Sequence, residues 1–99
     1  MSVYAIALLT ITDREKYGRY VSKFMGIMSR FRGKLLAADD KPEVIEGVWD
    51  RNRVVVLSFP DEAAFHEFWD SPEYREIVKD RWAGSNGVIL LAKGFPGSA

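Results

Sequence analysis

The chain has 99 residues, which is enough for one domain with its own hydrophobic core. Apolar residues make up 47% of the sequence and aromatic residues 13%, and this composition excludes an intrinsically disordered chain. Fourteen basic and fourteen acidic side chains cancel, so no positive field is available to attract nucleic acid. There is no cysteine, which excludes disulfides, thiol nucleophiles and cysteine metal sites.

The N-terminal segment predicts a strand over Val3–Ile11. Its sequence, MSVYAIALLTITD, has no basic region, and its apolar run is short and rich in β-branched residues. Such a run is typical of a strand and not of a signal peptide or a membrane span. We therefore expect a cytoplasmic protein that does not bind a membrane.

A long amphipathic helix is predicted to follow this strand. Thr12 or Asp13 is placed to cap its first turn, and apolar residues then recur at helical spacing between residues 17 and 31. Gly33 is expected to end the helix in a left-handed conformation.

The middle of the chain reads as extended structure. Short strands are predicted over Lys34–Ala38 and Glu43–Trp49, and a longer one over Arg53–Phe59. The longer strand is apolar on both faces, whereas an antiparallel strand with one face in water alternates polar and apolar residues. We therefore expect helices to cover one face of the sheet and a second copy of the chain to cover the other.

Helical segments and a last strand complete the sequence. Asp61 and Ser71 are placed as helix N-caps, and Pro72 suits the first turn after Ser71. Asn86-Gly87 predicts a turn that leads into a strand over Val88–Lys93. The helix positions that we expect to be buried against the sheet include Phe24, Phe65, Phe68 and Ile77.

The elements follow the order β-α-β-β-α-β, with an extra extended piece at residues 43–49. This order predicts an α+β protein of the ferredoxin-like plan, in which an antiparallel sheet carries its helices on one face. We expect a single domain over residues 1–99, with its core in residues 3–94 and a tail at 95–99. Whether the final Gly97-Ser98-Ala99 is native stays open.

Several segments together resemble domain-of-unknown-function family 1330, in the dimeric α+β barrel superfamily. They are TDREKYGRYV, GKLLAADDKPEVIEGVW and RVVVLSFPDEAAFHEFWDSPEYREI, with Arg81 beyond them. The resemblance covers residues 3–94. It implies a homodimer of facing sheets and no established activity. Relatives in the superfamily include cofactor-free monooxygenases, muconolactone-type isomerases, polyketide cyclases and haem-degrading enzymes.

Arg81 is the leading candidate for a binding site, because it lies on a helical face that is otherwise apolar. The other residues assigned to this face are Tyr74, Ile77, Val78 and Trp82. A guanidinium in such a place suits an anionic ligand, a carboxylate or a phenolate. The alternatives are an ion pair with Glu46, itself a candidate, or a guanidinium lying over an aromatic ring.

Four further residues are candidates for contacting a ligand. Arg53 either reaches the ligand or pairs with Asp50 across a turn. Tyr74 can offer its hydroxyl to a ligand, and Ser71 belongs either to the site or to the helix cap alone. Trp69 belongs to a set of aromatic residues that suit either a ligand cleft or core packing: Tyr4, Tyr17, Tyr20, Trp49, Trp69 and Trp82.

No metal or cofactor is predicted. His66 is the only histidine, and we expect it at the surface, at the edge of the apolar helical stripe. The acidic pair Asp39-Asp40 lies in a predicted turn without a second histidine to complete a metal site. Haem-degrading relatives carry an asparagine on the first strand, and this first strand has none.

Two functions follow from these residues and the resemblance. The first is a small homodimeric protein that binds a small aromatic or anionic organic molecule in a cleft, with a reaction of the cofactor-free monooxygenase or isomerase kind left open. The second is a non-catalytic dimerisation or sensing module that has no substrate. A cleft beside Arg81 favours the first function, and the identity of the ligand stays open.

Overall fold

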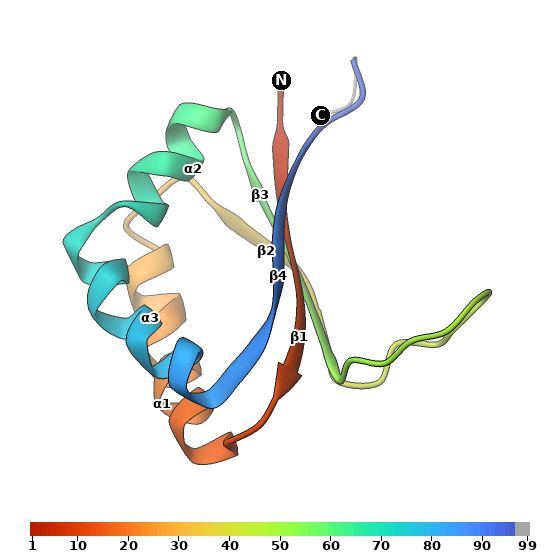
Figure 1. Ribbon diagram of the computed structural model, residues 1–99. Coiled ribbons are helices and arrows are strands. Elements are labelled where there is room, and N and C mark those ends of the chain that lie inside the picture. The colour runs from red at the N-terminus through yellow and green to blue at the C-terminus, as the bar shows by residue number, and fades with distance from the viewer. Residues whose placement is uncertain (97–99) are drawn as a thin grey trace.

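The computed structural model describes residues 1–96, so the Gly97-Ser98-Ala99 end of the predicted tail lies outside the described residues. The elements in chain order are β1 (Val3–Ile11), α1 (Arg14–Met28), β2 (Lys34–Asp39), β3 (Arg53–Phe59), α2 (Glu62–Trp69), α3 (Pro72–Gly84) and β4 (Ser85–Lys93). Figure 1 shows two layers, with all three helices on one face of the sheet. The predicted α+β, ferredoxin-like fold is confirmed.

The sheet has the strand order β2-β3-β1-β4, and every neighbouring pair is antiparallel. The central strand β1 pairs Leu8 with Val54 on one side and with Val88 on the other. Because side chains alternate along each strand, these residues share the face that carries no helix. We call it the open face, and its larger apolar side chains are Tyr4, Ile6, Leu8, Val54, Val56, Val88 and Leu90.

The helices begin where the capping residues predict. Asp13, Asp61 and Ser71 each accept a hydrogen bond from the backbone N–H three residues later, at N···O distances of 3.2, 2.8 and 3.1 Å. Asp13 is therefore the cap of α1, and Thr12 is not. Each cap satisfies a backbone donor that the first helical turn leaves without an intrahelical partner.

The core lies between the helices and the sheet. Phe65, Phe68 and Ile77 are buried as predicted, whereas Phe24 is half-buried and packs against them. The prediction that Trp82 lies on the inner face of α3 is wrong, because its side chain is 57% exposed. The buried positions of α3 run through Tyr74, Ile77, Val78, Arg81 and Gly84, and Trp82 falls just outside this stripe.

Two glycines allow close packing and do not have the roles predicted for them, a helix end at Gly33 and a turn at Gly87. The helix α1 ends at Met28 with Ser29 as its C-cap, and Gly33 does not take a left-handed conformation. A Cβ at Gly33 would come within 2.6 Å of the ring of Phe59. Gly87 lies within β4, opposite Leu9, with φ of 153°, so the predicted Asn86-Gly87 turn is wrong. A side chain at Gly87 would collide with the carbonyl oxygen of Leu8, which is why the strand needs glycine at this point.

Residues 40–52 leave the sheet between β2 and β3, and we call this segment the arm. It projects from the sheet on the side away from the helices (Figure 1). The strand predicted over Glu43–Trp49 is wrong: no residue of this stretch joins a sheet. Its alternating pattern resembles a strand, but the described part of the chain offers it no partner strand.

Candidate functional site

A cavity of about 110 Å³ lies between the helices and the sheet. Ala5 and Ala7 of the central strand help to make this space, because their short side chains leave room beneath the helices. The lining of the cavity includes three exposed residues, Val21, Met25 and Leu35. The cavity therefore opens to the surface between α1 and β2. An apolar cavity of about 150 Å³ holds a benzene molecule, so this smaller cavity takes at most one ring, with any further group of the ligand at the opening.

Arg81 lines this cavity and is only 7% exposed. Its guanidinium carbon lies 5.9 Å from the ring centre of Tyr20 and 5.7 Å from that of Trp69. The Nε atom is buried without a hydrogen-bond partner, and no carboxylate of residues 1–96 forms an ion pair with Arg81. A buried charge without a counter-ion costs several kcal/mol, so the site favours an incoming anion.

The ion pair that the sequence suggested between Arg81 and Glu46 is wrong. Glu46 lies on the arm, where it is exposed and lines a separate hollow. Of the two alternatives to ligand binding, the structure shows only the placement of the guanidinium over aromatic rings. Such contacts stabilise the charge by about 0.5–2 kcal/mol, but they leave its hydrogen-bond donors available.

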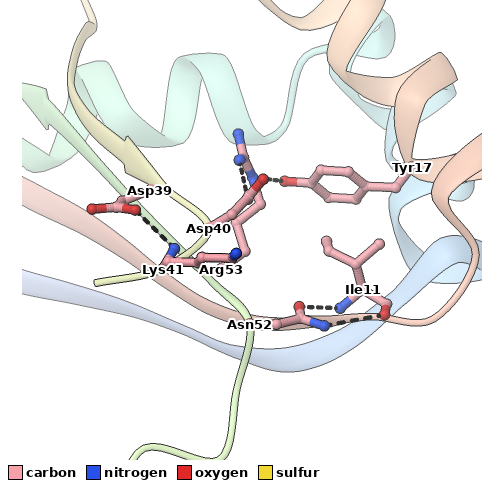
Figure 2. Close-up of polar contacts among 7 residues, drawn as sticks. All are labelled: Ile11, Tyr17, Asp39, Asp40, Lys41, Asn52 and Arg53. Carbon is pink, nitrogen blue, oxygen red and sulfur yellow. Dashed lines mark hydrogen bonds and ion pairs between the residues drawn. The ribbon is translucent and has the colours of Figure 1, made fainter. Parts of the chain in front are cut away.

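Arg53 also lines the cavity, but its charge has a partner. Its Nη1 donates to Oδ1 of Asp40 at 2.7 Å, and its Nε donates to the hydroxyl of Tyr17 at 2.9 Å (Figure 2). The alternative predicted from the sequence, an ion pair between Arg53 and Asp50, is therefore wrong. Burial acts to lower the pKa of Arg53, yet its hydrogen bond to the carboxylate of Asp40 and its contact with Tyr17 outweigh burial and raise the pKa, so the side chain stays charged.

Three tyrosines supply the hydroxyl groups of the cavity: Tyr17, Tyr20 and Tyr74. The hydroxyls of Tyr20 and Tyr74 lie 2.9 Å apart and share a hydrogen bond. Burial raises the pKa of Tyr20 well above its usual value, and it also raises that of Tyr17, although Arg53 offsets part of the effect. Tyr17 and Tyr20 are therefore neutral at physiological pH and can donate hydrogen bonds.

The other predicted site residues are dispersed. Trp69 and Tyr74 line the cavity, whereas Ser71 caps α3 and donates its hydroxyl to the carbonyl of Phe68, away from the cavity lining. His66 is exposed. Among the other aromatic residues considered for a cleft, Tyr17 and Tyr20 line the cavity, whereas Tyr4, Trp49 and Trp82 do not.

The pairing of Asp40 with Arg53 is the contact of the candidate site that sequence reasoning missed. Asp39 pairs with Val54 in the β2–β3 ladder, so the next residues along the two strands are Asp40 and Arg53. This register therefore brings the two charges together, and it can be read only once the strands are aligned. In residues 1–96 no three His, Cys, Asp or Glu side chains gather closely enough to hold a metal ion. No helix in the same range is long and apolar enough to cross a membrane.

Solved structures of other proteins show the same fold. A protein of unknown function from Rhodopseudomonas palustris matches with a TM-score of 0.80 at 22% identity, over 95% of this chain and 82% of that chain. SnoaB, a cofactor-independent oxygenase from Streptomyces nogalater, matches with a TM-score of 0.69 at 15% identity, over 98% of both chains. A dimeric ferredoxin-like protein of unknown function from Thermobifida fusca YX gives 0.64 at 15% identity, over 92% of this chain and 89% of that one.

Sequence comparison identifies the family of the chain. A search of curated proteins finds no significant match. The family model described as "Domain of unknown function (DUF1330)" matches residues 2–95, which is nearly the whole chain. The protein therefore belongs to the DUF1330 family.

Proposed function

We propose that this protein is a homodimer that binds one small aromatic anion, a single-ring carboxylate or phenolate, in the cavity of each subunit. The observation that carries the proposal is Arg81, a guanidinium that is 7% exposed, has no carboxylate partner among the described residues and lines an open cavity. The aromatic walls suit a ring, the positive charge suits an anion, and the volume of about 110 Å³ limits the ligand to about one ring.

The two arginines have different roles in this proposal. Arg81 holds the anionic group of the ligand, because its donors are free of carboxylate partners. Arg53 is already held by Asp40 and Tyr17, so it contributes a fixed positive charge near the cavity without being the main anchor. Trp69 and Tyr20, whose rings flank Arg81, contact the ring of the ligand.

The homodimer is supported by the open face. Val88 and Leu90 of this face are 42% and 48% exposed, and they adjoin further apolar residues of β1 and β3. A contiguous apolar surface on a sheet indicates an interaction site. The solved relative from Thermobifida fusca YX is described as dimeric, which supports the same assembly for this chain. The cytoplasmic location expected from the sequence stays a prediction.

A reaction of the bound ligand is a second candidate function. The shared fold of SnoaB, described as a cofactor-independent oxygenase, favours oxygenation over other reactions. Oxygen consumption by the purified protein in the presence of a bound phenolate tests this function. Consumption that disappears in Arg81→Met would establish it, whereas binding without consumption would support a binding or sensing protein.

A thermal-shift screen tests the binding proposal. The panel contains single-ring aromatic carboxylates and phenols acidic enough to be ionised at neutral pH, each with a neutral analogue of the same shape. We expect anionic members to raise the melting temperature of the natural protein and of Arg30→Met, in which an exposed arginine has been changed. Arg81→Met should lose the shift. If no anion stabilises the natural protein, or if Arg81→Met responds equally, the proposal is wrong.

A further inference from the structure

The arm of an isolated subunit exposes apolar side chains to water, which is unfavourable. Ile45 is 85% exposed, Val48 is 96% exposed and Val44 is 49% exposed. Between residues 42 and 50, no backbone hydrogen bond or ion pair joins the arm to any other described residue. The outer arm therefore receives no backbone hydrogen bond or ion pair from the described part of its own subunit, and burial of its apolar side chains against another surface would stabilise it.

The arm and the open face together form a concave surface. A hollow of about 420 Å³ lies where they meet, and its apolar lining includes Val44, Ile45, Val48, Trp49 and Val54. Val54 belongs to the open face, where it pairs with Leu8, so the hollow continues directly into that face. The arm projects on the same side of the sheet (Figure 1). Any partner that covers the open face therefore also meets the arm.

The base of the arm is fixed to the sheet at two points, both drawn in Figure 2. At one end, Asp40 pairs with Arg53 at 2.7 Å. At the other, the side chain of Asn52 accepts a hydrogen bond from the backbone N–H of Ile11 at 2.7 Å. The backbone N–H of Asn52 also donates to the carbonyl oxygen of Leu9, which the figure does not draw. These contacts set the direction in which the arm leaves the sheet, and a segment fixed before binding loses less entropy when it binds.

We propose that the arm is a clasp between subunits: in the homodimer, each arm reaches around the second copy and buries Val44, Ile45 and Val48 against it. The occupant is a second copy, because the hollow is continuous with the face through which the chain is proposed to dimerise. A two-fold symmetric dimer makes the contact twice, because the arm of each subunit packs against the other subunit. The inference rests on the homodimer of the proposed function and not on the ligand.

Site-specific photocrosslinking tests the clasp. Benzoylphenylalanine replaces Val48 on the arm or, as a matched control, the exposed Lys79 of α3. Unlabelled and ¹⁵N-labelled chains are mixed before irradiation, so that mass spectrometry separates links between chains from links within one chain. We expect position 48 to give hybrid links to the strands of the other chain, and position 79 to give none.

Sedimentation of the same samples separates the clasp from the homodimer itself. A dimer whose arm links only within its own chain, or not at all, would overturn the clasp and leave the homodimer standing. A monomer at every concentration would overturn both. In addition, Ile45→Asp with Val48→Asp should raise the dissociation constant of the dimer at least about tenfold. Glu43→Gln with Glu46→Gln, on the same arm, should leave it within about threefold; equal effects would contradict the clasp.

Discussion

At the residue scale, the two cavity arginines differ in whether their charge has a partner. Arg53 is held by Asp40 and Tyr17, whereas Arg81 has only aromatic rings around its guanidinium. Protein stability does not favour a buried charge of the second kind, since a well-packed apolar side chain in its place is often neutral or stabilising. This absence of a counter-ion among the described residues is the observation from which we propose that Arg81 binds an anion.

Replacing Arg81 by Met tests this difference by stability alone. Met keeps the length of the side chain and removes the charge, so the free energy of unfolding should stay the same or rise by about 1–4 kcal/mol. Denaturant unfolding without any ligand measures it, with Arg30→Met as the surface control. A loss of more than about 1 kcal/mol in Arg81→Met would mean that the guanidinium stabilises the fold.

Tyr20 predicts how stability depends on alkaline pH. Because burial raises its pKa in the folded protein, the unfolded chain releases its proton first as the pH rises through about 10. The unfolded state then binds fewer protons than the folded state, so the free energy of unfolding falls above that pH. Unfolding between pH 8 and pH 11 should show this decline, and Tyr20→Phe should reduce its slope. An unchanged slope would contradict the effect of burial.

The sequence predicted that Arg81 is withdrawn from water, because its spacing from Ile77 and Val78 puts it on a buried helical face. It did not predict the partners of the charged side chains correctly. The partner of Arg53 depends on the β2–β3 register, and the position of Glu46 depends on where the arm points. Both are properties of the folded chain that no local pattern contains.

At the element scale, the sequence predicted helix starts most reliably, because a capping side chain must accept a hydrogen bond from a backbone N–H of the first turn. The three helix caps and the bounds of β1 and β3 agree with the predictions, since capping residues and runs of β-branched and large apolar residues are short-range patterns. The turn predicted at Asn86-Gly87 is wrong because a sequence does not distinguish a glycine that forms a turn from a glycine that gives space to a neighbouring backbone. Here Gly87 gives space to the carbonyl of Leu8 rather than forming a turn.

Gly87→Ala tests this explanation. The new methyl group would strike the neighbouring strand, so the free energy of unfolding should fall by about 1–3 kcal/mol or more. Gly18→Ala is the matched control, because a Cβ at this position in α1 meets nothing within 4 Å and alanine favours a helix. We expect opposite signs for the two variants, and a neutral Gly87→Ala would contradict the close approach of β1 and β4.

Phe68→Ala and Trp82→Ala test the corrected assignment of the helix faces. Phe68 is 1% exposed and its ring packs against Phe24, Phe31 and Phe59, so its loss should cost about 3–5 kcal/mol. Trp82 is 57% exposed, and its loss should cost about 1 kcal/mol or less. Comparable losses in the two variants would place Trp82 in the core after all.

At the scale of the whole molecule, the order of elements was enough to predict the ferredoxin-like sheet and the face that the helices cover. The cavity and the arm could not be predicted in the same way. The cavity arises where the short side chains of Ala5 and Ala7 lie among large aromatic side chains from the helices. The arm arises because residues 43–49 find no partner strand among the described residues. Both depend on long-range packing rather than on sequence periodicity.

The open face predicts the assembly. We expect a homodimer at micromolar concentration that buries at least about 1,600 Å² in total. Ile6→Glu places a charge in the middle of that face and should give a monomer in sedimentation, because a charge without a partner is costly in an apolar interface. Lys23→Glu, on the exposed side of α1, should remain dimeric. A natural protein that sediments as a monomer would contradict the homodimer.

Calorimetric titration of the best anionic ligand is the most direct test of a binding site at Arg81. We predict one ligand per subunit for the natural protein and for Arg30→Met. In Arg81→Met, loss of a hydrogen bond to a charged group worth about 1.5–3 kcal/mol should weaken binding about 10- to 100-fold. Equal affinity in Arg81→Met and in the natural protein would contradict the central claim, because the ligand would then bind elsewhere or without the buried charge.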